Sequence, residues 1–210
     1  MSQPILLLNC GSSSIKYQLL DPSQPGPQAV GIVQRIGQDM STIDHEVGGS
    51  EYHEDLRFAD HTEAVAAVVK MFVEHGPDLD SVVAVGHRTV HGGSTFVESV
   101  QIDDAVIAKL EELSDLAPLH NPPAIAGIRA AQEVLPDVPH VAIFDTAFFS
   151  TLPAEAYTYA IDAELAEQYG IRKYGFHGTS HSYVSKKAAE FLERPLTELK
   201  TIVCHLGNGA

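Results

Sequence analysis

The stretch ILLLNCGSSSIKYQLL, residues 5–20, places two apolar segments on either side of a short polar turn. The four consecutive apolar residues at its start predict a buried strand. After the turn, Ile15, Tyr17 and Leu19 alternate with polar residues, which predicts a second strand. The sequence therefore predicts a β-hairpin with a turn rich in glycine and serine.

The chemistry of this turn suits an anion. Gly11 permits close backbone approach, and successive N–H groups in a turn can form a nest for negative charge. Three serines, residues 12–14, add hydroxyl donors, and Lys16 adds a positive charge. The turn is not a Walker loop, because the Gly-x-x-x-x-Gly-Lys-[Ser/Thr] pattern is absent and a strand follows it. Two interpretations stay open for these residues alone: a phosphate-binding turn and an ordinary polar hairpin.

Beyond the hairpin, strand and helix patterns alternate, which predicts an α/β fold. Further strands are expected at Ala29–Ile36, within 37–57, and at Val82–Val85, Val138–Phe144 and Thr201–Cys204. Helices are expected at 60–76, at 103–114, from Pro122, near 162–169 and at Ser180–Leu192, with a loop at 170–180. Because the turn residues change around 148–153, we expect one domain at 1–149 and another beginning at 150–210.

For two of the expected helices, the sequence indicates both an end of the helix and the residues of its inner face. The first has a capping residue, Asp60, and ends at Gly76-Pro77. Its expected inner residues are Val65, Val68, Val69, Phe72 and Val73. Two prolines begin the helix at Pro122, and its expected inner residues are Ile125, Ile128 and Ala131.

The composition of the chain argues against several classes of protein. The 210 residues include 28 Asp and Glu against 13 Lys and Arg, a net charge of -15, which argues against nucleic acid or an anionic membrane as the main partner. No run approaches about 18 apolar residues, and no signal-peptide pattern is seen at the N-terminus. Cys10 and Cys204 are too few for a disulfide framework, so a reducing cytoplasm is the simplest expected setting.

Two motifs follow expected strands, where α/β proteins place ligand-binding groups. In GHRTVHGG, residues 86–93, Arg88 could hold a carboxylate or phosphate through two parallel hydrogen bonds. His87, His91 and His120 fit no familiar zinc spacing, so a structural role is favoured for the first two. In VAIFDTAFF, Asp145 could be a base, a metal ligand or an orienting group, or a cap on the following turn.

The motif YGFHGTSH, residues 174–181, is the least typical of a plain loop. His177 lies between Phe176 and Gly178, where the backbone can approach a ligand, and its ring could donate to a developing phosphoryl oxygen. An aromatic plug under a loop is the alternative, and for His181 we favour a helix-terminal hydrogen bond. Residues 203–209 also align weakly with 7–13, which would fit an internal duplication.

Taken in order, NCGSSSIKY, HRTVHGG, HNPP, FDTAFF, YGFHGTSH and HLGNG resemble the acetate kinase family. The resemblance implies the actin-like ATPase fold, also called ribonuclease H-like, in which a mixed sheet with a β-β-β-α-β-α-β-α core is duplicated and nucleotide binds in the cleft between the copies. It implies reversible transfer of a phosphoryl group from ATP to acetate, with Mg²⁺ or Mn²⁺ as cofactor. A cytoplasmic homodimer is also implied for the full-length protein, with no role for nucleic acid or membrane.

The resemblance also implies residue roles. Asn9 would help to place Mg²⁺. The implied phosphate contacts are Ser12, Ser14, Lys16, His205, Leu206, Gly207, Asn208 and Gly209. The implied acetate subsite is Arg88, Val90, Leu119 and Phe176. The implied catalytic residues are Arg88, His120, Asp145 and His177. Since acetate is already ionised near neutral pH, we expect Asp145 to orient groups or water-bound Mg²⁺ rather than to act as a strict base.

The chain departs from the family pattern mainly in length. Family members continue for about as many residues again, with a second active-site arginine, a Mg²⁺-linked glutamate and most of the adenosine pocket. We therefore interpret this chain as an incomplete piece, inactive alone, whose second domain stops within the second phosphate motif. Thr89 stands where valine is frequent. Two alternatives remain: a propionate or other short-chain acyl kinase, or a non-catalytic fragment that binds anions or self-associates.

Overall fold

The computed structural model describes residues 3–207, which divide into two compact units. The first unit contains the described residues up to Thr89 together with Val100–Ile143. The second contains Val90–Ser99 and the described residues from Phe144 onward. The second unit thus begins at Phe144, a few residues before the predicted boundary at 149/150. The loop Val90–Ser99 also belongs to the second unit, although the residues on both sides of it in sequence belong to the first.

The strands form one mixed sheet, as expected for the predicted fold class. They are β1 (Ile5–Cys10), β2 (Ser14–Leu20), β3 (Pro27–Gln34), β4 (Ser41–Val47), β5 (Ser50–Leu56), β6 (Ala84–Thr89), β7 (Val100–Gln101) and β8 (His140–Phe144). Their order in the sheet is β5-β4-β3-β2-β1-β6-β8-β7. The first five strands pair antiparallel in succession, whereas β1 pairs with β6 in parallel. The predicted opening hairpin is confirmed, and so are strands within 37–57.

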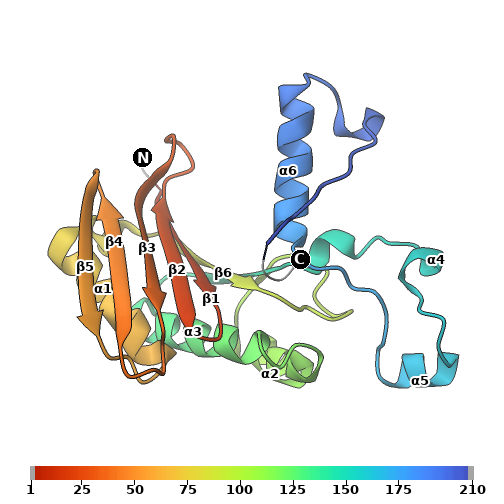
Figure 1. Ribbon diagram of the computed structural model, residues 1–210, viewed down its shortest axis with the longest axis horizontal. Coiled ribbons are helices and arrows are strands. Elements are labelled where there is room, and N and C mark those ends of the chain that lie inside the picture. Colours follow the sequence, from red (N-terminus) through yellow and green to blue (C-terminus); the bar gives the residue numbers. More distant parts are fainter. Residues whose placement is uncertain (1–2, 208–210) are drawn as a thin grey trace. The chain divides into compact units, whose positions relative to one another are not determined.

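Side-chain alternation gives the central strands one core face. On β1 and β2, the inward residues include Leu6, Leu8, Ile15, Tyr17 and Leu19, each at most 3% exposed. Helices α1 (His61–His75) and α3 (Asn121–Val134) cover this face (Figure 1). Since successive side chains point to opposite faces, the polar residues between the inward ones project from the other face.

The remaining helices are shorter apart from the last. They are α2 (Asp104–Glu112), α4 (Ala154–Tyr157), α5 (Ala163–Gln168) and α6 (Gly178–Phe191), with 3-10 turns at Leu79–Ser81, Leu113–Leu116, Ala147–Phe149 and Leu196–Glu198. Helix α6 begins two residues before the predicted start at Ser180. In the described part of the chain, no helix combines the length and apolar character that a membrane span requires.

The predicted ends of α1 are confirmed by its capping geometry. The Asp60 carboxylate accepts hydrogen bonds from the N–H groups of Thr62 and Glu63 at 2.8 and 3.0 Å. Gly76, with φ of 75°, ends the helix and donates its N–H to the carbonyl of Phe72. The buried residues differ from the predicted ones, because Val73 is 80% exposed and Val69 is half-buried, whereas Ala64 and Met71 are buried. The prediction for Val73 was therefore wrong.

Two strand predictions need correction. The strand predicted at Val82–Val85 begins at Ala84 and continues to Thr89, so Arg88 lies within β6 rather than after it. The strand predicted at Thr201–Cys204 is absent, and Ile202 in this segment is 91% exposed. Strands need pairing partners, and no strand of residues 3–207 pairs with this segment. The alignment of residues 203–209 with 7–13 extends beyond the described residues, so the suggested duplication stays a prediction.

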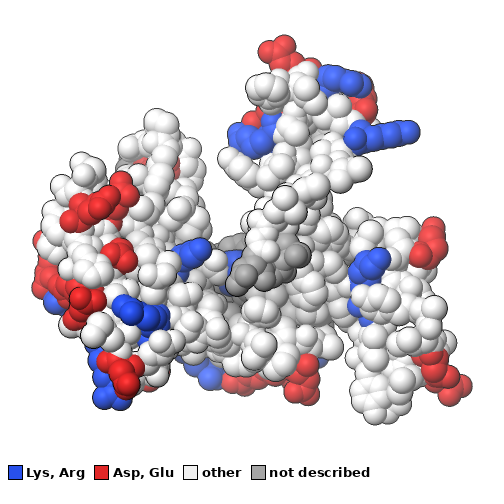
Figure 2. Space-filling model, viewed as in Figure 1, with Lys and Arg blue, Asp and Glu red and all other residues white. Residues whose placement is uncertain are grey.

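The outer hairpin of the sheet is strongly charged. Strand β5 lies at the edge and has the sequence SEYHEDL. Figure 2 shows acidic side chains gathered over the β4–β5 end of the sheet. Charged side chains on an edge strand discourage pairing with another chain, so this end of the sheet is protected against aggregation.

Candidate functional site

The hairpin turn predicted to bind phosphate is closed by short backbone hydrogen bonds. The Gly11 N–H donates to the Ser14 carbonyl at 2.7 Å, and the Ile36 N–H donates to the Ser13 carbonyl at 3.0 Å. Ser12 is exposed and Ser14 is half-buried, so both hydroxyls remain accessible at the turn. The turn thus has a fixed backbone and open side chains.

A histidine that sequence reasoning missed also holds this turn. His61, the first residue of α1, places Nε2 2.7 Å from the Gly11 carbonyl, to which its N–H donates. The two residues are 50 positions apart, so no local pattern could have linked them. His61 therefore connects the start of α1 to the predicted phosphate-binding turn.

Three predicted residues of the first unit share the sheet face opposite the helices. Asn9 on β1 lies directly across from Lys16 on β2 in the antiparallel register. Arg88, on the neighbouring parallel strand β6, donates from Nη1 to the Asn9 amide oxygen at 3.2 Å. Lys16 is exposed, whereas Asn9 and Arg88 are half-buried. Two cationic side chains and an amide therefore converge beside the hairpin turn, as an anion site requires.

The two predicted residues that precede α3 lie at the surface of their unit. His120 is the N-cap residue of α3 but its side chain makes no capping hydrogen bond, and it is exposed. Leu119 is 72% exposed. Their predicted roles, in catalysis and in the methyl subsite, remain predictions.

In the second unit, Asp145 follows β8 and is 1% exposed. The Thr179 hydroxyl donates to its carboxylate at 3.0 Å, and the Gly178 N–H donates to its carbonyl at 3.1 Å. The N-cap residue of the following 3-10 turn is Thr146 and not Asp145. Asp145 instead holds the start of α6, and Thr179 is a contact that sequence reasoning missed.

The glycine at the start of α6 explains how the YGFHGTSH motif reaches Asp145. A Cβ atom on Gly178 would lie only 2.0 Å from the Asp145 carbonyl oxygen. No larger residue fits this approach without displacing backbone. The unusual composition of the motif therefore has a packing reason.

His177 and His205, both predicted site residues, lie against each other. Their rings stack with centroids 4.2 Å apart and an interplanar angle of 9°. His177 has a left-handed backbone with φ of 57°, and His205 Nδ1 lies 3.0 Å from the Ser180 hydroxyl. Leu206 and Gly207 are exposed, and the predicted contacts Asn208 and Gly209 lie outside the described residues.

The two residues of the predicted methyl subsite that lie in the second unit differ in exposure. Val90 is buried, whereas Phe176 is 46% exposed. The Phe176 ring meets the edge of His91 at 5.8 Å, so it packs on a buried histidine of the HRTVHGG motif. Within the second unit, the structure therefore joins Phe176 to this motif.

The structural role favoured for His87 and His91 agrees with their contacts. His87 is 2% exposed, and its Nε2 lies 2.9 Å from Nδ1 of His140. Because His140 Nε2–H donates to the Leu135 carbonyl, its Nδ1 must accept from His87. His91 Nδ1 accepts from the Gly93 N–H at 3.0 Å. Both rings therefore serve internal hydrogen bonds.

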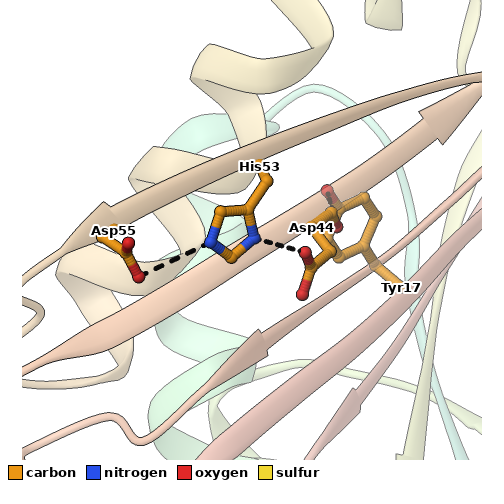
Figure 3. Close-up of polar contacts among 4 residues, drawn as sticks. All are labelled: Tyr17, Asp44, His53 and Asp55. Carbon is orange, nitrogen blue, oxygen red and sulfur yellow. Dashed lines mark hydrogen bonds and ion pairs between the residues drawn. The ribbon is translucent and has the colours of Figure 1, made fainter.

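Another histidine lies between two carboxylates on the outer hairpin. His53 on β5 contacts Asp44 at 2.6 Å and Asp55 at 3.5 Å (Figure 3). The hydrogen bond to Asp44 is the main reason that the pKa of His53 is raised. The group is exposed at the sheet edge, so it forms a surface ion-pair cluster.

Comparisons with known proteins agree with these motifs. The sequence profile described as "Acetokinase family" matches residues 4–210. An acetate kinase of Clavibacter michiganensis subsp. michiganensis is 55% identical over 208 residues, which cover 98% of this chain and 52% of that protein. The chain therefore spans about half the length of the curated relatives it matches.

Solved structures show the same likeness. The crystal structure of Porphyromonas gingivalis acetate kinase superposes with a TM-score of 0.86 at 41% identity, covering 92% of this chain and 50% of that one. A propionate kinase from Francisella tularensis gives a TM-score of 0.86 at 40% identity, covering 91% and 50%. The fold is thus shared with a solved acetate kinase and a solved propionate kinase.

Proposed function

Because the chain belongs to the acetokinase family, we propose that the whole protein transfers a phosphoryl group reversibly from ATP to acetate, giving acetyl phosphate and ADP. The observation that carries this proposal is the convergence of Arg88, Asn9 and Lys16 beside the serine-rich turn. All the substrates and products of this reaction are anions, and phosphoryl transfer depends chiefly on positioning and charge neutralisation.

Each residue of the first unit takes a role that its position supports. Arg88 binds the acetate carboxylate or the transferring phosphoryl group through its guanidinium. Lys16, Ser12 and Ser14 bind ATP phosphates, with the turn held in shape by His61. His120 supports the same reaction from the start of α3.

The second unit supplies residues for the same reaction. Asp145 is held by Thr179 and orients reacting groups, since acetate needs no deprotonation near neutral pH. His177 donates to the developing charge on the phosphoryl group, and the stacked His205 helps to hold its ring. Val90 and Phe176, with Leu119, surround the acetate methyl group. The segment from His205 to Gly209 contacts ATP phosphates.

The described residues fit a magnesium ion that is bound mainly by nucleotide and water. No group of three His, Cys, Asp or Glu among residues 3–207 could hold a metal. Mg²⁺ in kinase sites usually keeps several waters and takes only one or two protein oxygens in addition to phosphates. The Asn9 amide oxygen accepts one hydrogen bond from Arg88 and would provide one such ligand through its second lone pair. When bound, the ion would neutralise phosphate charge.

A second candidate function is transfer to propionate or another short-chain acid. The Francisella tularensis propionate kinase matches this chain as well in structure as the Porphyromonas gingivalis acetate kinase does. The residues of the proposed methyl subsite do not decide the acyl chain length. Acetate is preferred here because the curated relatives at 52% to 55% identity are acetate kinases.

The proposal extends to organisation and setting. We place one domain at 1–149 and the start of another at 150–210, and we infer a homodimer for the full-length protein. Both cysteines are free, with Cys10 buried and Cys204 exposed, which supports a reducing, cytoplasmic setting. Burial raises the pKa of the Cys10 thiol to about 12, so this residue is unreactive.

A hydroxamate assay for acyl phosphates tests the activity. Full-length protein and the 210-residue chain are each incubated with ATP, Mg²⁺ and acetate, propionate or butyrate. We expect acetyl phosphate from the full-length protein and none from the chain alone. Preference for propionate would replace acetate with the second candidate, and no product from any acid would refute the kinase proposal.

A further inference from the structure

The second unit contains a pocket that shares no residue with the proposed catalytic set. Its volume is about 210 Å³. The residues that line it are Gly93, Ser94, Phe96, Val97, Thr146, Phe149, Ser150, Arg172 and Tyr174. All of them belong to one unit. None is acidic, although the chain has 28 acidic residues against 13 basic ones.

Arg172 is the cationic residue of this pocket, and aromatic rings hold it in place. Its guanidinium carbon lies 3.7 Å from the ring centre of Tyr157 and 5.4 Å from that of Tyr174. The neighbouring Lys173 N–H donates to the Tyr157 carbonyl at 2.8 Å, which fastens this loop. Cation–π contacts of this kind fix a guanidinium without neutralising its charge.

The guanidinium retains most of its hydrogen-bonding capacity. Its Nε donates to the Lys173 carbonyl at 3.4 Å, and no carboxylate of the described residues lies within ion-pair distance. The two Nη groups therefore provide a planar fork of donors, the geometry that binds carboxylate or phosphate through paired hydrogen bonds.

Hydroxyl groups complete the pocket. Thr146 accepts from the Gly92 N–H at 3.0 Å, so its own O–H is left to donate. Ser94 and Ser150 have side-chain hydroxyls with no hydrogen-bond partner in residues 3–207. Phe96, Phe149 and Tyr174 form the aromatic part of the wall. The pocket thus combines one positive charge, three hydroxyl donors and no negative charge.

We propose that this pocket is an anion-binding site for a phosphate or a small dicarboxylate, with Arg172 as the charged contact and Ser94, Ser150 and Thr146 as donors. Its volume equals about seven waters at roughly 30 Å³ each, which suits a ligand of a few heavy atoms and is too small for a nucleotide. Thr146 follows Asp145 directly, so an anion here would bind one residue from a proposed catalytic group. The inference does not depend on the proposed kinase activity.

Calorimetric titration of the full-length protein with phosphate and, separately, malonate tests this site at constant ionic strength. Titrations are made in an Arg88→Ala background, which removes the main cationic contact of the proposed substrate site. We expect Arg172→Gln to weaken binding of at least one anion by about tenfold or more. Arg194→Gln, which removes an exposed arginine of the same unit, should change affinity less than twofold.

A second variant tests the site in case Arg172→Gln does not fold. Ser150→Val leaves Arg172 and its stacking ring unchanged but replaces a hydroxyl with methyl groups, and we expect at least a threefold loss of affinity. The proposal would be overturned if Arg172→Gln bound the anions with the same affinity as the parent. If Arg172→Gln does not fold, the same affinity in Ser150→Val and the parent would overturn it. So would the absence of binding by both anions. A failed acetyl phosphate assay with intact anion titrations would refute the kinase proposal alone.

Discussion

At the scale of single residues, the buried hydroxyl of Thr89 lowers the stability of the fold, and the sequence alone does not reveal this. The residue is fully buried at the end of β6, and its hydroxyl has no hydrogen-bond partner in residues 3–207. Valine has nearly the same shape, so Thr89→Val should raise the free energy of unfolding by about 1 kcal/mol, measured by urea denaturation. Thr146→Val, which removes the acceptor of the Gly92 N–H, should lower it by about 1 kcal/mol. A loss of stability in Thr89→Val would mean that its hydroxyl has a partner.

A mutational test of His177 must distinguish the loss of its imidazole from strain in its left-handed backbone. Its left-handed backbone disfavours alanine, whereas asparagine tolerates this conformation. His177→Asn should therefore retain the fold and lower kcat roughly a hundredfold with little change in KM, because the proposed imidazole donor to the transition state is lost. Steady-state kinetics with acetate provide the measurement, and His181→Ala is the matched control. A change in KM alone would contradict transition-state stabilisation.

At the scale of elements, the contact between β6 and β8 makes stability depend on pH. Burial, and secondarily His140, lowers the pKa of His87 to about 3, and burial also lowers the pKa of His140. In the unfolded chain these groups titrate near 6.5, so the unfolded state binds more protons as pH falls below that value. The contribution of His87 to stability is therefore fully present above about pH 6.5 and is lost toward pH 3, by up to about 1.4 kcal/mol per pH unit. The lowered pKa of His140 adds a pH dependence of the same sign.

Urea denaturation at a series of pH values between 7.5 and 4.5 measures this effect. His87→Gln preserves a donor toward His140 but does not titrate, so its stability should fall less steeply with acid than that of the parent. His45 and His91 also have lowered pKa values because they are buried, and they keep some pH dependence in the variant. Parallel slopes for the two proteins would show that His87 is not neutral in the fold.

The start of α6 depends on the absence of a side chain at Gly178. A Cβ there would meet the backbone of Asp145 at 2.0 Å, so Gly178→Ala should force the helix away from this residue. We expect a loss of about 1–3 kcal/mol in the free energy of unfolding, together with a lower kcat. Lys186→Ala, an exposed position of the same helix, is the control and should change neither quantity. Unchanged stability in Gly178→Ala would mean that the loop can shift without cost.

Local signals explain which elements could be predicted. The hairpin, the capped helix α1 and the proline-started helix α3 depend on residues adjacent in sequence, and all three were predicted correctly. The second half of β6 was missed because Gly86 to Thr89 interrupt an apolar run, yet these residues continue a strand that pairs with β1. Thr201–Cys204 has an apolar strand pattern but no pairing partner in the described chain, and pairing is not a local property.

The candidate site could likewise be predicted only in part from local sequence. Its motifs could be recognised because small, polar and cationic residues follow apolar segments. The contacts that hold them, such as His61 on Gly11 and Thr179 on Asp145, join positions 50 and 34 residues apart and carry no local signature. The Arg172 pocket likewise combines three separate segments, so only the structure could reveal it.

At the scale of the whole molecule, an acidic chain concentrates a few cationic side chains where anions are expected to bind. The mixed sheet places Arg88 against Asn9 on the face opposite the core helices, and the second unit holds Arg172 between aromatic rings. The net charge of -15 would otherwise repel the proposed anionic substrates, so local cations must overcome it. The central claim is therefore that Arg88 is indispensable for phosphoryl transfer.

The most direct test measures acetyl phosphate formation by full-length protein, Arg88→Ala and Arg129→Ala under identical conditions. Arg129 pairs with Glu111 at 2.8 Å on the surface, so its removal tests only the loss of one positive charge. We predict that the parent and Arg129→Ala have equal kcat/KM for acetate, whereas Arg88→Ala loses at least about a hundredfold, with a higher KM and a lower kcat. Equal activity in Arg88→Ala and the parent would contradict the role assigned to this residue and to the site built around it.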